Sequence, residues 1–499
     1  MSWPSAAKAR LAAAVGLALL ATACAVGPDF HRPSTAGADA YTREPLPEQT
    51  ASADIAGGAA QRLAAGKDIP AQWWTAFHSE SLDALIKEAF RANPSVQGAQ
   101  AALRQANELV AAQRGFFFPT LQASFSATRQ KNPTGTLAPT LNSGVPVFNL
   151  YTSQLSVGYT FDLLGGNRRQ VESLEAQAEY QRFQLEATYI TLSTNVVTTA
   201  VQEAAARAQI AATERIYAIE TEQVQIMQRE LELGAIAESD VAAQEVLLAQ
   251  TAALLPPLRK QLALQRDQLS ALLGRLPVQE PVEVFELDRL QLPAELPLSL
   301  PSKIVEQRPD VRAAEAQMHA ASANVGVQIA NMLPQITLNA GLGGTAVDFG
   351  RMFSEGSKFW SVGANLSQTL FAGGTLYHRE RAAVDALDQA GAQYRSTVIT
   401  AFQNVADTLH ALVFDADALK ADLDAERAAE RSLNYARSAH ELGAISYLAL
   451  LNAEQAYQQA VVNRVQAQAN RYADTAALFQ ALGGGWWNRD EQTRVSGQP

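Results

Sequence analysis

Residues 167–233 read NRRQVESLEAQAEYQRFQLEATYITLSTNVVTTAVQEAAARAQIAATERIYAIETEQVQIMQRELEL, and these 67 residues contain neither Gly nor Pro. Because Gly and Pro are the residues that most strongly disfavour a helix interior, the stretch predicts one uninterrupted helix. At 1.5 Å per residue, such a helix is roughly 100 Å long. Residues 375–442 contain only Gly391 and predict a second helix of the same kind. We therefore expect an elongated helical part that no compact domain could hold.

The apolar spacing of both helices predicts that they pack side by side. In the second helix, apolar residues step by four and three as in a coiled-coil seam: Val398, Phe402, Val405, Leu409, Leu412, Ala416, Leu419 and Leu423. The first helix carries two apolar rows, namely Ile210, Tyr217, Val224 and Leu231, and Ile219, Ile226 and Leu233. The two rows lie on opposite flanks. A helix with two apolar flanks has neighbours on both sides, which indicates a layer of several helices.

The chain also matches itself at a distance of about 210 residues, as internal repeats do. ELGAI at 232–236 recurs at 441–445, and NPSV at 93–96 corresponds to RPDV at 308–311. Each copy is expected to contain a first helix (81–114 or 302–332), two strands, a long helix ended by Gly234 or Gly443, and a returning helix. Pro256 and Pro257 are expected to break the first returning helix.

These matches predict the domain organisation. We expect structural repeats at 81–274 and 302–485 and a C-terminal tail at 486–499. A Pro-rich connector at 275–301 suits an extended, solvated tether.

Four segments alternate apolar and polar residues with a period of two, which predicts strands with one apolar face. Phe125, Tyr159 and Trp360 belong to the apolar set. One interpretation is a soluble sheet packed on one side. The other is a set of membrane strands with these side chains facing lipid and the Ser, Thr, Gln and Asn rows facing water. Four strands cannot close a barrel, since the smallest single-chain barrels have eight. The membrane interpretation therefore requires strands from several copies, eight from a dimer or twelve from a trimer.

The N-terminus reads as a secretory signal at 1–23, with Lys8 and Arg10 before an apolar stretch. Small residues then precede Cys24, the single cysteine of the chain. Ordinary signal cleavage and lipidation of Cys24 both fit this pattern, and the position of the cysteine favours lipidation. Residues 24–80 are then a lipid-anchored extended segment.

Composition argues against several functional classes. The net charge of −11 makes nucleic acid an unexpected partner. One cysteine forms neither a disulfide framework nor a cysteine zinc site, and the six histidines are widely separated. The sequence has no phosphate-binding loop or nucleophile motif. We therefore expect no metal, no cofactor and no enzymatic activity. Two tryptophan pairs, Trp73–Trp74 and Trp486–Trp487, suit either interfacial anchors or core residues.

Several stretches resemble the outer-membrane factors of bacterial efflux pumps, the TolC-like NodT branch. They are CAVGPDF at 24–30, YTFDLLGGNRR at 159–169, LPLSLPSKIVEQRPDVRAAEAQ at 296–317 with NMLPQITLNAGLGG at 331–344, and FAGG at 371–374. The resemblance implies an α+β membrane protein: a trimeric twelve-stranded β-barrel, four strands per chain, continued by a long helical barrel. It also implies a lipid-anchored outer-membrane channel that reaches into the periplasm. Such a channel passively conducts small molecules, including drugs and toxic compounds, from a periplasmic adaptor and an inner-membrane pump to the exterior.

The resemblance also implies roles for residues at the two helical turns. The adaptor-contacting tips would be Gly234, Ala235, Ile236, Asp240, Gly443, Ala444, Ile445, Ser446 and Tyr447. The periplasmic gate would be Leu448 and Asn452, where Asn replaces an acidic residue of the family. Alternatively, Leu448 and Asn452 are ordinary coiled-coil residues, and Asp240 only complements the dipole of the returning helix.

Two other functions fit the same pattern. The chain could be the outer-membrane component of type I protein secretion, which uses the same kind of channel with a different pump. It could also be a non-porous periplasmic coiled-coil scaffold lipoprotein that binds partners without forming a pore.

Overall fold

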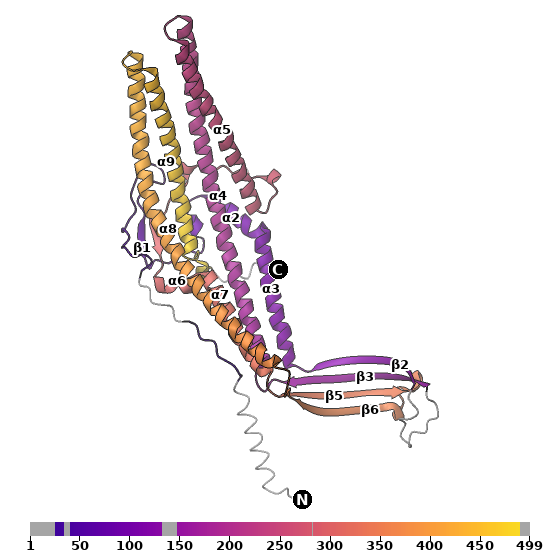
Figure 1. The fold of residues 1–499 in the computed structure, drawn as a ribbon. Coiled ribbons are helices and arrows are strands. Elements are labelled where there is room, and N and C mark those ends of the chain that lie inside the picture. The colour runs from indigo at the N-terminus through magenta and orange to yellow at the C-terminus, as the bar shows by residue number, and fades with distance from the viewer. Residues whose placement is uncertain (1–24, 34–39, 132–146, 282, 490–499) are drawn as a thin grey trace. The chain divides into compact units, whose positions relative to one another are not determined.

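The protein is described from a computed structural model that covers residues 25–33, 40–131, 147–281 and 283–489. The expected signal segment and Cys24 lie outside the described residues. The chain separates into two units: unit 1 comprises residues 1–32, 103–181 and 314–394, and unit 2 comprises the remaining residues. The long helices α4 (Gly166–Glu232) and α8 (Thr375–Glu441) have residues in both units. The described chain is α+β and mostly helical (Figure 1).

Unit 1 is built on a four-stranded antiparallel sheet. Its strands are β2 (Thr120–Lys131), β3 (Val147–Phe161), β5 (Gln335–Ala346) and β6 (Lys358–Ser367). Their order in the sheet is β2-β3-β5-β6 (Figure 1). The four predicted strands are therefore confirmed, and β2 and β6 are edge strands with no partner on their outer sides within the described chain.

The helices that precede the strand pairs are each interrupted by a proline. The single helices predicted at 81–114 and 302–332 are wrong, because the structure has α2 (Glu80–Ala92) with α3 (Pro94–Arg114), and α6 (Pro301–Gln307) with α7 (Pro309–Ala330). Proline lacks an N–H and disfavours helical geometry in the residue before it. Asn93 and Arg308 accordingly have extended backbones, with ψ of 124° and 122°.

The long helices form two helical hairpins, which we call hairpin 1 (α4 with α5, Glu238–Leu272) and hairpin 2 (α8 with α9, Tyr447–Ala481). Their turns and returning helices belong to unit 2. Both long helices have 67 residues and both returning helices have 35. The seam predicted in the second long helix is confirmed, since its side chains from Val405 to Leu423 are buried.

The predicted break in the first returning helix is wrong, because α5 is continuous with Pro256 and Pro257 inside it. Both prolines are exposed, and the fixed φ of proline suits a helix. Water can therefore solvate the carbonyls that lose their N–H donors. Among the described residues, α5 is also the one helix whose length and composition would allow it to cross a membrane. A helix that packs against neighbours on several sides can have the same length and the same apolar composition.

The Pro-rich connector is packed inside unit 2, against α9 and the N-terminal segment, so the prediction of a solvated tether is wrong. Its strand β4 (Glu295–Leu298) pairs in parallel with β1 (Arg62–Ala65) of the N-terminal segment. The hydroxyl of Tyr472 lies 3.0 and 2.8 Å from the carbonyl oxygens of Leu287 and Leu290 in the connector. Buried apolar side chains of the connector, such as Phe285 and Leu296, explain why it does not stay extended in water.

The first tryptophan pair belongs to the core of unit 2. The short helix η1 (Trp73–Phe77) buries both tryptophans, and the Trp73 ring stacks on Phe479 of α9 at a centroid distance of 5.2 Å. Trp486 and Trp487 of η8 (Trp486–Asn488) donate indole hydrogen bonds to Gln307 O and to the Asp68 carboxylate. In the described chain all four indoles thus have protein contacts.

Candidate channel elements

The strand register places most apolar residues of the four strands on one face of the sheet, and Phe148, Leu150 and Phe359 lie on the other face near the loop end. Residues directly opposite each other on antiparallel strands point to the same side. One cross-strand row is Leu121, Val157, Ala340 and Val362, and the next is Ala123, Leu155, Leu342 and Trp360. The opposite face carries hydroxyl pairs such as Thr152 and Thr345, whose oxygens are 3.0 Å apart. The predicted alternation is therefore confirmed for residues 121–127, 154–161, 336–342 and 360–366.

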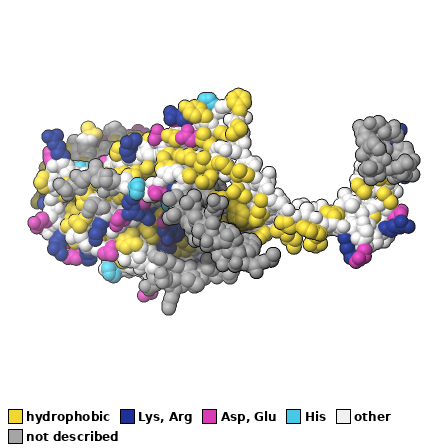
Figure 2. Space-filling view, turned by 90° about the horizontal axis from the view of Figure 1, so that it is seen from below, with side chains coloured by type: hydrophobic (Ala, Val, Ile, Leu, Met, Phe, Trp, Pro, Cys, Tyr) yellow, Lys and Arg dark blue, Asp and Glu magenta, His cyan; other side chains and the backbone are white. Residues whose placement is uncertain are grey.

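Charged residues occur in this sheet only at one end. Arg129, Lys131 and Lys358 are the charged residues of the four strands, and all lie at the end where β2 joins the loop to β3 and where β6 begins. Figure 2 shows hydrophobic side chains along the sheet, with charged side chains gathered at its far end. The uncharged stretches are 9 residues in β2 and β6, 12 in β5 and 15 in β3, so each reaches the 9–11 residues that a membrane strand needs. The distribution suits a sheet with lipid on one face.

The two hairpin turns have the same backbone geometry. Gly234 and Gly443 have φ of 73° and 72°, a left-handed conformation that favours glycine. Gly234 N donates to Leu231 O at 2.9 Å and Gly443 N to His440 O at 2.8 Å, and in each turn the next amide donates five residues back. This is the Schellman motif that ends a helix. It leaves Leu233 and Leu442, each 84% exposed, at the tips.

The other predicted tip residues have different surroundings. Ala235 and Ala444 are exposed, and Ile236 and Ile445 are half-buried. The Ser446 hydroxyl caps α9 by accepting from Ala449 N at 3.4 Å. Asp240 lies in the first turn of α5, where the helix dipole favours a carboxylate.

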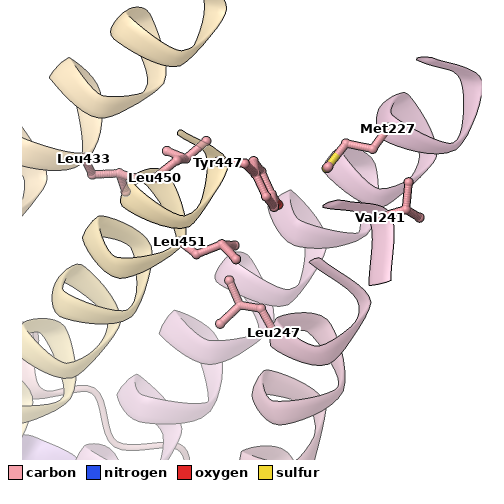
Figure 3. Close-up of a cluster of buried hydrophobic side chains, with 7 residues drawn as sticks. All are labelled: Met227, Val241, Leu247, Leu433, Tyr447, Leu450 and Leu451. Carbon is pink, nitrogen blue, oxygen red and sulfur yellow. The ribbon is translucent and has the colours of Figure 1, made fainter. Parts of the chain in front are cut away.

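Tyr447 differs from the other tip residues because its side chain is only 7% exposed. Figure 3 shows it between the two hairpins, in a cluster that we call the tip cluster. The cluster consists of Met227, Val241 and Leu247 of hairpin 1 and Leu433, Tyr447, Leu450 and Leu451 of hairpin 2. Burial raises the pKa of Tyr447, and its hydroxyl has no hydrogen-bond partner in the described chain. Tyr447 therefore holds the two hairpins together behind the tips.

The predicted gate residues lie outside the tip cluster, on an exposed side of α9. Leu448 is 65% exposed, and Asn452 follows one helical turn later and is also exposed. Residues four apart share a helix face. Neither side chain belongs to the seam between the hairpins of one chain, so both are available to line a space shared with other chains.

A short N-terminal segment is held in unit 1 by a buried arginine, which the sequence had not predicted. We call residues 25–32 the N-terminal clasp. Arg169 of α4, 4% exposed, donates to Val26 O at 3.0 Å and to the Asp29 carboxylate at 2.7 Å. Val26 N donates to Leu164 O at 3.1 Å, and Phe30 stacks on His319 at 4.4 Å. The residue after Cys24 thus lies beside the junction of β3 and α4.

Two buried acids between the hairpins were also missed. Glu220 of α4 and Glu454 of α9 are 2% and 5% exposed, and each has one carboxylate oxygen without a partner in the described chain. Glu454 corresponds to Glu245 at the same spacing as the repeated ELGAI segments, and this match could have pointed to the second acid. In the part of the chain that the structure describes, no group of three or more His, Cys, Asp or Glu side chains could hold a metal ion.

Comparison with known proteins identifies the family. The model of the outer membrane efflux protein family matches residues 85–275 and 300–484, most of the chain. The chain belongs to the outer membrane efflux protein family. It is therefore an efflux channel of the outer membrane.

Individual relatives match over nearly their full lengths. The pyoverdine export outer membrane protein OpmQ of Pseudomonas aeruginosa is 30% identical over 447 residues, covering 85% of this chain and 90% of its own. The antibiotic efflux pump outer membrane protein ArpC of Pseudomonas putida is 28% identical over 475 residues, 94% of each chain. The solved outer-membrane channel OprN has a TM-score of 0.82 at 27% identity, with 93% of this efflux protein and all of OprN covered.

Proposed function

We propose that three copies of this efflux protein pool their strands into one twelve-stranded barrel in the outer membrane. The observation that supports this most strongly is the sheet itself, which has one apolar face, one polar face and two unpaired edges, β2 and β6. Open strand edges do not occur in lipid, because each unpaired backbone group costs several kcal/mol there. Pairing β2 of one copy with β6 of the next removes every edge, and the polar face then lines a water-filled lumen.

The hairpins continue this barrel as a helical tunnel. The apolar row Ile219, Ile226 and Leu233 is exposed in the single chain, as expected if another copy covers it. The two halves of the chain, 81–274 and 302–485, act as structural repeats around the connector, and residues 486–499 form the tail. Equal helix lengths, equal glycine turns and the two family matches support this division.

The tunnel ends at the glycine turns, where Leu448 and Asn452 narrow it and the exposed tip residues contact a periplasmic adaptor. Tyr447 contributes to docking indirectly, by fixing the spacing of the tips. The N-terminal clasp supports lipidation of Cys24, since it holds Val26 beside Leu164, between the end of β3 and the start of α4. An acyl chain there would reach the outer-membrane lipid.

Transport through the duct is passive, and an inner-membrane pump supplies the energy through the adaptor. The relatives export pyoverdine, antibiotics and toluene according to their names. We propose small organic molecules of this kind as the exported class.

Conductance in planar lipid bilayers tests the proposal. Purified wild-type protein is expected to form discrete ion-conducting channels. Protein that inserts in the bilayer but never conducts would contradict a duct and favour a non-porous scaffold.

A further inference from the structure

A charged cavity lies between the two hairpins, just behind the tip cluster. It has a volume of about 360 Å³, and both Glu220 and Glu454 line it. Its charged side chains come from three helices. They are Arg215 and Glu220 of α4, Glu426, Glu430 and Arg437 of α8, and Glu454 and Arg464 of α9. Tyr457 of α9 also lines the cavity. From α5, Thr251 contacts Glu220 and Asp240 acts on Tyr447. Carboxyl groups thus outnumber guanidinium groups by one.

The carboxyl groups in this cavity are not equally well paired. Arg464 contacts Glu426 at 2.7 Å, and Arg437 contacts one oxygen of Glu454 at 3.5 Å. Glu220 receives a hydrogen bond from Thr251, whose hydroxyl accepts from Gln458 Nε2 at 3.0 Å. This relay joins α4, α5 and α9, so it crosses from hairpin 1 to hairpin 2. The second oxygens of Glu220 and Glu454 have no partner in the described chain.

We propose that Glu220 and Glu454 form a proton-binding site between the hairpins, and that loss of the proton weakens hairpin packing. An unpaired carboxylate is costly in a buried site, whereas a protonated carboxyl is not. When both carboxyl groups ionise, two negative charges face the same cavity. The arginines in the cavity neutralise these charges only in part. Separation of the hairpins exposes both carboxylates to water and relieves this cost.

The pKa values agree with this geometry. Burial raises the pKa of Glu220 from 4.5 to about 7, and the nearby Glu454 adds to the shift. Burial also raises the pKa of Glu454, against the opposing effect of Arg437. A group whose pKa is raised in the packed state stabilises that state at low pH. This stabilisation is complete below 4.5 and is lost as the pH rises to about 7. The proton site does not depend on the proposed duct.

Hydrogen–deuterium exchange of the full-length protein tests the site. We expect protection in residues 213–258 and 427–461, corrected for the intrinsic pH dependence of exchange, to fall at least about tenfold between pH of about 5 and 8. Glu220→Gln keeps the shape but cannot ionise, so it should reduce the pH dependence of protection in these segments and leave only the part that Glu454 contributes. Glu245→Gln is the matched control, because Glu245 is the exposed counterpart of Glu454 in hairpin 1. It should behave like wild type.

Glu454→Gln serves as the second variant, and far-UV circular dichroism checks that each variant is folded. It should reduce the pH dependence even if Glu220→Gln does not fold. The site is overturned if wild-type protection does not change with pH, or if a folded Gln variant retains the full pH dependence. A lack of conductance at every pH would instead contradict the duct and leave the proton site standing.

Discussion

Arg169 Nη2 lies 2.7 Å from Asp29 Oδ1, although the two residues are 140 positions apart. The same guanidinium donates to Val26 O and to the Glu172 carboxylate, 2.8 Å away. Charge-assisted hydrogen bonds of this length are among the stronger ones in proteins. They fix the N-terminal clasp to the start of α4.

Arg169→Ala is expected to release the clasp. The variant loses several hydrogen bonds at a buried position, which costs about 2 kcal/mol or more. Cleavage within residues 25–32 by a protease of broad specificity should therefore accelerate roughly tenfold or more. Arg114→Ala is the control, because Arg114 pairs with Glu175 at an exposed site where a salt bridge contributes little. Wild-type cleavage rates in the Arg169 variant would show that the clasp is held by other contacts.

Two substitutions of Tyr447 separate the contribution of its ring to stability from the contribution of its buried hydroxyl. Tyr447→Phe keeps the ring and removes an unpartnered polar group, so thermal stability should stay equal or rise by up to about 1 kcal/mol. Tyr447→Ala leaves a cavity between the hairpins and should cost about 3 kcal/mol or more. Thermal unfolding followed by circular dichroism measures both. If the two variants lose similar amounts of stability, the Tyr447 hydroxyl makes a stabilising hydrogen bond, which would contradict its assignment as an unpartnered group.

Neighbouring positions of β6 test which face of the sheet meets lipid. Val362 lies on the apolar face and Ser361 on the polar face. Val362→Lys should reduce insertion into liposomes, since Lys near the middle of the bilayer costs about 2–4 kcal/mol. Ser361→Lys should insert nearly as well as wild type, because its side chain would point into water. Equal insertion of the two variants, or the reverse order, would exclude the proposed orientation of the sheet.

Substitutions of the two proposed gate residues should change the single-channel current in different ways. Leu448→Ala removes apolar bulk from an exposed face of α9 and should raise single-channel conductance several-fold without loss of stability. Asn452→Asp adds a carboxylate one turn away and should increase cation selectivity and make the current sensitive to divalent cations. Tyr435→Ala, an exposed change in α8, should alter neither property. Unchanged currents in the first two variants would place the constriction elsewhere.

The sequence predicted those parts of the fold that depend on local signals. The long helices follow from the absence of Gly and Pro in residues 167–233, and the sheet faces follow from strict alternation around Phe125 and Trp360. Both patterns are visible within a few turns or strand residues. The exposed tips were likewise predictable from the two glycines at 234 and 443.

The remaining features depend on contacts between distant residues. The packing of the connector against Tyr472, the clasp around Arg169 and the burial of Glu220 each join segments far apart in the chain. The effect of proline on the helices was predicted wrongly in two opposite ways. Pro94 divides a predicted helix where the preceding residue becomes extended, whereas Pro256 and Pro257 sit in a continuous helix at exposed positions. Pro94 is exposed as well, so exposure of the proline does not separate the two outcomes, and the local sequence does not separate them either.

The mass of the detergent-solubilised protein, measured by native mass spectrometry, tests the central claim most directly. Pooling of strands predicts a complex of three chains, with no stable species of one chain that retains the β-sheet. A folded single chain with its sheet intact would contradict the shared barrel, since β2 and β6 would then be stable without a partner.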